Sequence, residues 1–196
     1  LRITAHAPTR EEALRLIAPV EEQVKAILKD KVIGVDVDSL EEVCLRLLKE
    51  RGLTVGTAES CTGGLMAKLL TDLPGSSAVF RGGVVSYTNG VKAGLLGVPQ
   101  DLLDRYGAVS PQVAEAMARG AKAALGCDIA LSTTGVAGPD ADDRGNPIGL
   151  VYLGLAWGDQ CQVTEFHAGP VERERVRRQA AQTALDLLRR HLTGLD

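Results

Sequence analysis

The sequence predicts an α/β fold, a three-layer α/β/α domain built around a mixed, mostly parallel sheet. Apolar residues make up 45% and charged residues 24% of the 196-residue chain, which is typical of a globular protein. Strand-like and helical segments alternate through most of the chain, as parallel strands with helical crossovers require. Near the C-terminus two strand-like segments flank Gly158-Asp159, which predicts an antiparallel hairpin and makes the sheet mixed.

The chain divides into a short N-terminal segment and one larger domain. Residues 1–37 are too few to bury a core, so we interpret them as the tail of a preceding domain or as a linker segment. Because the chain begins with Leu1 and not with Met, we expect it to be a piece of a longer protein. Residues 38–196 then form the main domain.

The N-terminal segment is expected to be a strand, a helix and a second strand. Residues 2–6 and 32–37 have the alternation of short strands. Between them, Thr9 and Glu12 form a capping box that starts a helix. Pro19 should kink or interrupt this helix, because proline lacks an N–H and crowds the preceding turn.

Start and stop signals mark the elements of the main domain. Ser39, with an acidic residue three positions later, starts a helix that Gly52 ends. Ser110-Pro111 places an N-cap before a proline and opens another helix. The remaining patterns predict, in order, a strand at 53–58, a turn at 59–64, a helix at 65–72, a strand at 79–87, helices at 89–96 and 110–125, a strand at 127–132, a polar loop at 135–147, strands at 148–157 and 160–166, and a helix at 171–192.

Charge and composition exclude several classes of function. A formal charge of −3 and an aromatic content of 3% argue against direct nucleic-acid binding, which favours a basic excess and stacking side chains. No apolar run is long enough to span a membrane, and residues 1–8 do not form a signal peptide. The four scattered cysteines are typical of free thiols in a cytoplasmic protein. The histidines and cysteines lack zinc-ligand spacing, which disfavours a metal enzyme, although a carboxylate site for Mg²⁺ stays open as an alternative. We expect no cofactor.

The densest group of chemistry-bearing residues is T-A-E-S-C-T-G-G at 57–64, where a strand is expected to end and a helix to begin. Ser60 is a candidate nucleophile there, because unpaired N–H groups at a helix start stabilise an oxyanion. Gly63 and Gly64 let a ligand approach the backbone closely. The alternative, which the residues alone favour, is that Ser60 or Thr62 caps the helix and the glycines form a tight turn.

A serine nucleophile needs a base. His167 lies near the end of a predicted strand, although an exposed histidine without a role is the simpler interpretation. Lys92 follows a predicted strand–helix junction at Tyr87, so both side chains should stand at the mouth of the sheet. The alternatives are a hairpin turn at Asn89-Gly90 and an ordinary solvated lysine.

Two further segments are candidates for ligand binding. The T-T-G-V-A-G-P loop at 133–139 follows a strand, and ligands of open α/β sheets gather beyond the carboxyl ends of strands. A glycine-rich turn is the alternative. The last helix carries six arginines against three acidic side chains, which suits an anion such as phosphate. A charged exterior face with internal ion pairs is the alternative.

The combination of these motifs identifies a protein family more specifically than any one motif does. T-A-E-S-C-T-G-G at 57–64 and V-S-Y-T-N at 85–89 with Lys92 are followed by G-A-V-S-P at 107–111, G-V-A-G-P at 135–139 and V-R-R-Q at 176–179. This order and spacing resembles the C-terminal domain of the CinA family, the nicotinamide-mononucleotide amidohydrolase module also called PncC. The resemblance covers residues 38–196, and residues 1–37 resemble the segment that precedes this module in two-domain members.

The resemblance implies a metal-independent, serine-type amidohydrolase that deamidates nicotinamide mononucleotide to nicotinate mononucleotide and ammonia in pyridine-nucleotide salvage. It implies a catalytic group of Ser60, Tyr87 and Lys92, and a three-layer fold. The substrate-binding residues that it implies are Glu59, Cys61, Thr62, Gly63, Gly64, Thr133, Thr134, Gly135, Arg173 and Arg177.

The competing hypothesis is a nucleotide-binding sensor module without turnover, linked to competence or DNA damage. Release of ammonia from the nucleotide separates the two. In both, the expected partner is a small nucleotide, with no direct contact to nucleic acid or membrane. A homo-oligomer, a dimer, is expected.

Overall fold

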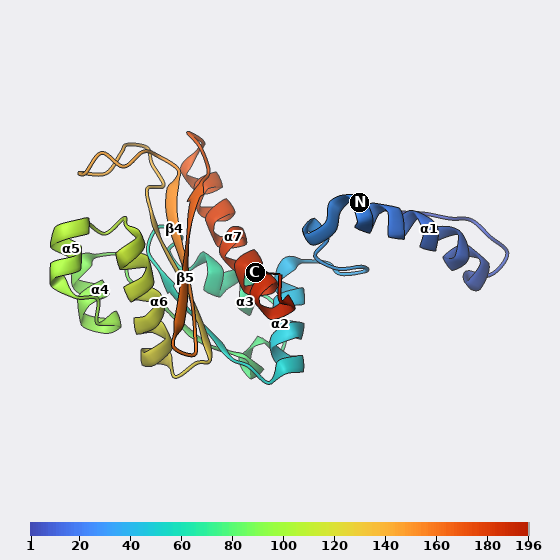
Figure 1. The fold of residues 1–196 in the computed structure, drawn as a ribbon, viewed down its shortest axis with the longest axis horizontal. Coiled ribbons are helices and arrows are strands. Elements are labelled where there is room, and N and C mark those ends of the chain that lie inside the picture. The colour runs from blue at the N-terminus through green and yellow to red at the C-terminus, as the bar shows by residue number, and fades with distance from the viewer. Residues whose placement is uncertain (196) are drawn as a thin grey trace. The chain divides into compact units, whose positions relative to one another are not determined.

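The computed structural model describes residues 1–195, which fall into two compact units, one of Leu1–Val37 and one from Asp38 onward. Figure 1 shows both units, coloured along the chain. Each unit has its own secondary structure, and the second holds the sheet.

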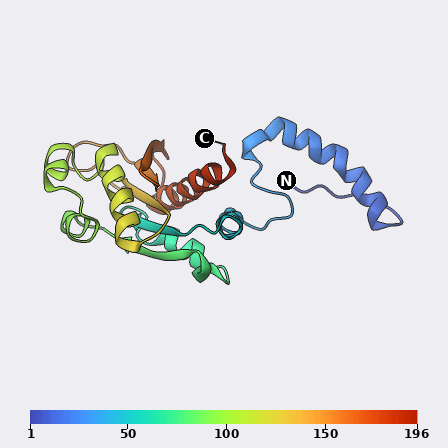
Figure 2. The same cartoon turned by 60° about the horizontal axis from the view of Figure 1, so that its bottom comes forward.

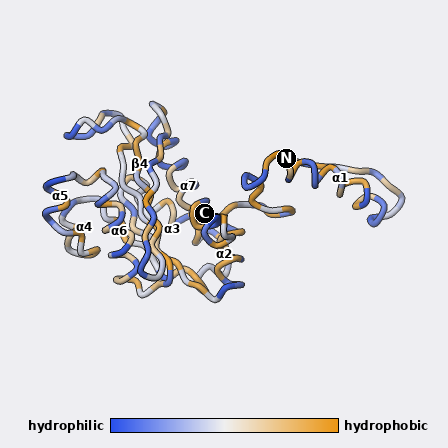
Figure 3. Tube along the Cα trace, viewed as in Figure 1, coloured by the Kyte–Doolittle hydropathy of each residue, from blue (hydrophilic) through white to orange (hydrophobic). Residues whose placement is uncertain are grey.

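The N-terminal unit contains one long helix, α1 (Arg10–Leu28), and a short 3₁₀ turn, η1 (Lys29–Lys31). The predicted cap is confirmed, because the Thr9 side chain accepts the Glu12 N–H at 3.2 Å. Hydrophobic and hydrophilic residues both occur along α1 (Figure 3). None of its residues is buried.

Two expectations for this unit are wrong. The segments at 2–6 and 32–37 are not strands, because neither pairs with another strand in the described chain, and an unpaired strand has no backbone partners to stabilise it. Of the two effects expected of Pro19, interruption of the helix is wrong, because the helix runs from Arg10 to Leu28, and a kink stays a prediction. The predicted strand–helix–strand segment is therefore a helix and a short 3₁₀ turn, flanked by residues that form neither helix nor strand.

The second unit is built on a five-stranded sheet with the order β2-β1-β3-β4-β5. β1 pairs in parallel with β2 and β3, whereas β4 runs antiparallel to β3 and β5. Only β4 runs opposite to the other strands, so the mixed, mostly parallel sheet is confirmed. The strands are β1 (Val55–Glu59), β2 (Phe80–Val85), β3 (Ile129–Gly135), β4 (Leu150–Trp157) and β5 (Gln160–His167).

Helices cover both faces of this sheet and complete the three layers (Figures 1 and 2). One buried cluster joins sheet residues such as Leu131 and Leu153 to Leu185 of the last helix, and the other joins Ala58 and Ala130 to the opposite helices. The three-layer α/β/α prediction is therefore confirmed. The first face carries α2 (Leu40–Arg51), α3 (Leu65–Thr71) and α7 (Arg173–Thr193), and the second carries α4 (Asn89–Leu96), α5 (Gln100–Tyr106) and α6 (Pro111–Leu125).

Local capping signals explain where the helices begin and end. Ser39 accepts the Glu42 N–H at 3.1 Å, and Gly52 ends α2 with a φ of +64°, a left-handed value that glycine adopts without strain. α5 could not be predicted from the sequence, because its seven residues show too little periodicity and its N-cap is a proline without a capping side chain.

The carboxyl ends of β1, β2 and β3 meet at one edge of the sheet. β3 extends to Gly135, beyond the predicted end at 132, because Thr133, Thr134 and Gly135 continue to pair with β4. The candidate residues at 59–64, 86–92 and 133–135 therefore converge on this edge. No helix within residues 1–195 has the length and apolar character needed to cross a bilayer.

Candidate active site

Ser60 lies directly beyond the last residue of β1. Its N–H donates to the Thr133 carbonyl at 2.9 Å, and its own carbonyl accepts the Gly63 N–H at 3.1 Å, which closes a tight turn. α3 begins only at Leu65, with Gly64 as its N-cap, so the interpretation of Ser60 or Thr62 as the cap is wrong. Ser60 is held by strand pairing and by the turn, which leaves its hydroxyl free for other contacts.

Lys92 reaches this hydroxyl from the first turn of α4. The side chain is 1% exposed, and its Nζ donates to Ser60 Oγ at 3.0 Å and to the Ser86 carbonyl at 2.8 Å. α4 starts at Asn89 after a Thr88 cap, so the hairpin and the solvated lysine are both wrong. The structure brings two residues 32 positions apart into direct contact.

Burial gives Lys92 an unusual proton affinity. Removal from water lowers the pKa of this amine from 10.5 to about 8, and the nearby Cys61 thiol acts weakly in the opposite direction. A much larger fraction of the amine is then neutral near physiological pH than for an exposed lysine. A neutral amine at hydrogen-bond distance from a serine hydroxyl has the geometry and proton affinity of a general base.

Glu59, the last residue of β1, lies inside the protein and anchors α3. Its carboxylate is 1% exposed and accepts the N–H groups of Met66 at 3.0 Å and Ala67 at 2.8 Å. These N–H groups belong to the first turn of α3, where backbone N–H groups have no acceptors within the helix. Both carboxylate oxygens are thus engaged within the protein, and Glu59 holds the turn that carries Ser60.

The Glu59→Gln variant is expected to lower the free energy of unfolding by about 1–3 kcal/mol. An amide side chain has one accepting oxygen, so one of the two α3 N–H groups would face an NH₂ group instead. Urea denaturation followed by circular dichroism measures the effect. The exposed Glu42→Gln variant is the matched control, for which a change within about 0.5 kcal/mol is expected. Equal stability of the two variants would contradict the anchoring role.

The turn after Ser60 is fixed from two sides. Thr62 Oγ1 shares a hydrogen bond of 2.7 Å with Thr133 Oγ1, and Arg177 Nη2 donates to the Thr62 carbonyl at 2.8 Å. Within residues 1–195 the N–H groups of Thr62 and Gly64 donate no hydrogen bond to the protein. Rigid, free N–H groups beside a nucleophile are suited to binding an oxyanion. They belong to the turn and not to α3, whose first N–H groups Glu59 occupies.

Tyr87 stands at the mouth of the site but is bonded elsewhere. Its side chain is 58% exposed, and its hydroxyl accepts a hydrogen bond from Arg173 Nη2 at 2.9 Å. Arg173 Nη1 also donates to the Gly138 carbonyl, at 2.5 Å. In the described chain the Tyr87 hydroxyl bonds to neither Ser60 nor Lys92. The structure therefore brings Ser60 and Lys92 together and places Tyr87 beside Arg173 at the entrance.

Thr133, Thr134 and Gly135 support the site from the end of β3. Thr133 and Thr134 are 0% and 1% exposed, and Thr134 Oγ1 donates to the Ala108 carbonyl at 2.6 Å. A Cβ on Gly135 would lie 2.5 Å from the Leu150 carbonyl, so only glycine fits there. The Thr133 hydroxyl bonds to Thr62 and the Thr134 hydroxyl to a backbone carbonyl, whereas the Ser60 hydroxyl contacts the Lys92 amine.

Cys61, although adjacent to Ser60, is not a competing nucleophile. Its side chain is 5% exposed, and burial raises the pKa of the thiol to about 12. The reactive thiolate is therefore scarce at any physiological pH. Among the described residues no three His, Cys, Asp or Glu side chains are grouped as metal ligands would be.

His167 does not serve Ser60 as a base. It lies at the end of β5, with its Nε2 2.6 Å from Glu165 Oε1. The strand order places β3 and β4 between β5 and the end of β1.

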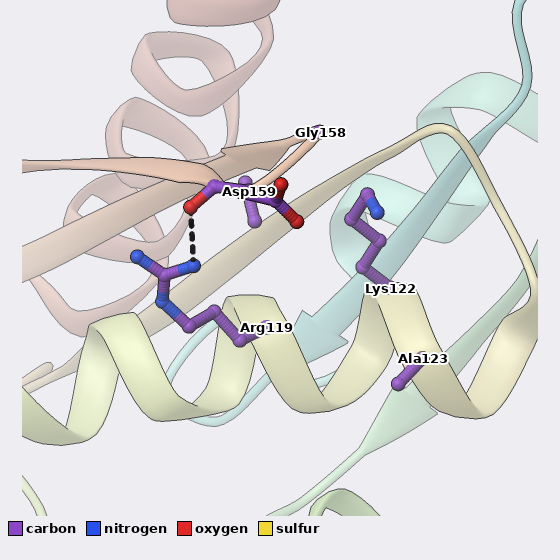
Figure 4. A pocket seen from close by; sticks show the side chains of 6 residues that line it. Arg119, Lys122, Ala123, Gly158 and Asp159 are labelled. Atoms are coloured by element: carbon purple, nitrogen blue, oxygen red, sulfur yellow. Dashed lines mark hydrogen bonds between the residues drawn. The ribbon is translucent and has the colours of Figure 1, made fainter.

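A pocket of about 200 Å³ lies at the opposite edge of the sheet, between α6 and the turn that joins β4 to β5 (Figure 4). Arg119, Lys122 and Asp159 line it, and Arg119 Nη1 donates to the Asp159 carbonyl at 3.0 Å. This edge carries the amino end of β3, whereas Ser60 is level with the carboxyl end. The pocket is separate from the candidate active site.

Sequence reasoning overlooked Ser86. Its carbonyl accepts the Lys92 hydrogen bond, and its buried hydroxyl has no partner within the described chain. The signal was present, because Ser86 lies within the V-S-Y-T-N motif and directly precedes Tyr87.

Comparison with known proteins places these residues in a family context. The model of the CinA C-terminal domain matches residues 37–192. A CinA-like protein of Trichormus variabilis is 50% identical over 194 residues, which are 98% of this chain and 47% of that protein. A CinA-like protein of Frankia casuarinae is 50% identical over 195 residues, which are 100% of this chain and 45% of that protein. The chain thus spans about half the length of the curated relatives that it matches.

Solved structures show the same fold. A competence-damaged protein (CinA) superfamily protein from Klebsiella pneumoniae has a TM-score of 0.76 and 30% identity, covering 80% of this chain and 99% of that one. The competence/damage inducible protein CihA from Agrobacterium tumefaciens has a TM-score of 0.72 and 39% identity, covering 79% of this chain and 96% of that one.

Proposed function

The chain belongs to the CinA family, and from this premise we propose that it is a metal-independent, serine-type amidohydrolase that deamidates nicotinamide mononucleotide. The products are nicotinate mononucleotide and ammonia. The observation that carries the proposal is the contact between a buried, readily deprotonated Lys92 and the Ser60 hydroxyl. An amide is a poor electrophile, so its hydrolysis needs an activated nucleophile of this kind.

In the proposed acylation step, Ser60 Oγ attacks the carboxamide carbon while Lys92 Nζ takes the hydroxyl proton. The carbonyl oxygen becomes an oxyanion, which the free N–H groups of the 60–64 turn are positioned to stabilise. Collapse of the tetrahedral intermediate breaks the C–N bond, and the Lys92 ammonium returns its proton to the leaving NH₂ group. Ammonia leaves, and the acyl group remains on Ser60 as an ester.

Deacylation uses Ser60 and Lys92 again, with Lys92 first as the base and then as the acid, and with Ser60 Oγ as the leaving group. Lys92, neutral again, takes a proton from a water molecule that attacks the ester carbon. The second tetrahedral intermediate expels Ser60 Oγ, which recovers its proton from Lys92. The net reaction consumes one water, and neither step needs a metal ion. The proposed compartment is the cytoplasm, where the four cysteines, all free in the described chain, would stay reduced.

Arg173 and Arg177 are proposed to have different roles at the substrate's phosphate. Arg173 is exposed at the entrance and is bonded to Tyr87 and Gly138, whereas Arg177 is partly buried and bonded to the Thr62 carbonyl. Phosphate contacts from guanidinium groups are charge-assisted and strong. Arg173 is therefore the better phosphate ligand, and Arg177 also supports the turn that carries Ser60.

The Arg173→Ala variant is expected to weaken binding of nicotinamide mononucleotide by about 1–3 kcal/mol. Binding of nicotinamide riboside, which lacks the phosphate, should change little, and isothermal titration calorimetry measures both ligands. Arg177→Ala should reduce kcat for both, because the Thr62 carbonyl loses its donor. If Arg173→Ala weakens both ligands equally, the arginine supports the structure and does not bind phosphate.

Ammonia release from nicotinamide mononucleotide by the purified chain tests the proposed function. A coupled glutamate dehydrogenase assay detects the ammonia, and calorimetry measures binding in parallel. The competing hypothesis, a nucleotide-binding sensor, predicts binding without ammonia. The competence and damage names of the relatives are compatible with either function. Turnover above the background of a Ser60→Ala variant is the expected result.

A further inference from the structure

Ser86 carries a buried hydroxyl that the fold does not satisfy. The residue is 0% exposed, and within the described chain its Oγ has no hydrogen-bond partner. Buried polar side chains nearly always have a partner, because an unpaired hydroxyl loses its bonds to water and gains nothing in exchange. Such an exception beside a reactive group calls for a functional explanation.

The sheet register places Ser86 next to Ser60. β1 and β2 pair Glu59 with Val85, and the Ser86 N–H donates to the Glu59 carbonyl at 2.8 Å, so the pairing continues by one residue. Ala58 and Val84, two residues earlier on each strand, both pack into the cluster on the α4 side. Because side chains alternate along a strand, Ser60 and Ser86 point to that same face, where Lys92 lies.

Lys92 has one donor more than it has partners. An ammonium group carries three N–H bonds, and Lys92 Nζ has two acceptors, Ser60 Oγ and the Ser86 carbonyl. In the neutral amine the lone pair faces the Ser60 proton and one N–H donates to the Ser86 carbonyl, so the second N–H also lacks an acceptor, but at a smaller cost because the group is uncharged. Once Lys92 has taken that proton, the third N–H needs an acceptor in a site from which water is largely excluded.

We propose that Ser86 Oγ is this third acceptor, a positioning residue that stabilises Lys92 as the ammonium formed when Ser60 attacks. This inference rests on the proposed role of Lys92 as the general base. Rotation about one side-chain bond moves the hydroxyl oxygen among three staggered positions around its Cβ, and in the proposed arrangement one of these positions receives the N–H. Ser86 neither gains nor loses a proton, and the proton of Ser60 stays on Lys92 until the leaving group takes it.

Among residues 1–195, the surroundings of Lys92 offer no charged group to accept this hydrogen bond. Lys92 is the only ionisable residue of α4, and Cys61 is the ionisable group that acts on it. Glu59 of β1 is bonded to the α3 amides, and the Tyr87 hydroxyl is bonded to Arg173.

The ionisable residues of α6, which packs against α4, are Glu115, Arg119 and Lys122. Glu115 and Arg119 pair with each other, and Lys122 lines the pocket at the opposite edge of the sheet.

The test is the pKa of Lys92 in the Ser86→Ala variant of the whole chain. The Cε signals of ¹³C-labelled lysine report it directly, since the chain has only seven lysines and the Lys92 signal is the one missing in Lys92→Arg. Loss of an acceptor for the ammonium should move the midpoint about one pH unit lower. This is a tenfold change in the ratio of neutral to charged amine, or about 1.4 kcal/mol.

Two further variants distinguish this role from a general effect of replacing a buried serine. Ser132→Ala is the matched control, because Ser132 is also a buried strand serine but its hydroxyl donates to the Ala114 carbonyl at 2.6 Å. It should leave the Lys92 midpoint unchanged. Ser86→Thr keeps the hydroxyl and should restore it. An unchanged midpoint in Ser86→Ala, or an equal shift in Ser132→Ala, would overturn the proposal. Because the titration needs no substrate, it is independent of whether the chain deamidates the nucleotide.

Discussion

The Lys92→Arg variant is expected to lose between about 100-fold and 10,000-fold in kcat, the range that a positioned general base contributes. Arginine keeps a positive charge near Ser60 but stays protonated at every pH at which the protein is folded. It therefore cannot take the Ser60 proton, and it should be nearly as inactive as Lys92→Met. Single-turnover rates of ammonia release, measured with the protein in saturating excess over the nucleotide, give the comparison without interference from product release.

The stability of the same variants provides the control. Lys92→Met removes an amine whose charged form is disfavoured by burial, so this variant should be at least as stable as the wild type. Loss of activity in a stable protein then reflects lost chemistry. If Lys92→Arg retains most of the wild-type rate, Lys92 supplies only a positive charge, and its assignment as a base is wrong.

The Ser60→Ala variant is expected to lower turnover by more than about 1,000-fold, because no acyl intermediate can form without the hydroxyl. Substrate affinity and stability should change little, since the Ser60 backbone holds the turn through its own N–H and carbonyl. Mass spectrometry of acid-quenched wild-type protein should detect an acyl adduct on the peptide containing Ser60, and the variant should lack it.

Cys61→Ala is the matched control for Ser60→Ala. It changes the adjacent residue in the same turn, but the buried thiol stays protonated and takes no part in the proposed reaction. Activity within a fewfold of wild type is expected. Near-normal turnover in Ser60→Ala, or a loss of activity in Cys61→Ala as large as that in Ser60→Ala, would remove Ser60 from the role of nucleophile.

Much of the fold could be predicted because local signals and the long-range pattern agree. The caps at Ser39 and Ser110 and the turn at Gly158-Asp159 each depend on a few neighbouring residues, and all three are confirmed. The prediction of strands at 2–6 and 32–37 was wrong because alternation alone does not make a strand, which needs a partner. Only the tertiary structure shows whether a partner exists.

The contact between Ser60 and Lys92 follows partly from sequence, since both were expected at the carboxyl edge of a parallel sheet. Their separation of 3.0 Å, the burial of Lys92 and its lowered pKa depend on how α4 packs against the sheet. Glu59 shows the limit of motif reasoning. The resemblance implied that it binds substrate, whereas its carboxylate anchors α3, a contact between a strand end and a helix start that the motif does not reveal.

The pH dependence of ammonia release from nicotinamide mononucleotide tests the central claim most directly. In the proposed mechanism the active form of Lys92 is neutral, and burial lowers its pKa to about 8. The wild-type rate should therefore rise tenfold per pH unit below this value and level off above it. A rate that is independent of pH between 6 and 9, or binding of the nucleotide without ammonia at any pH in that range, would contradict a lysine-activated serine amidohydrolase.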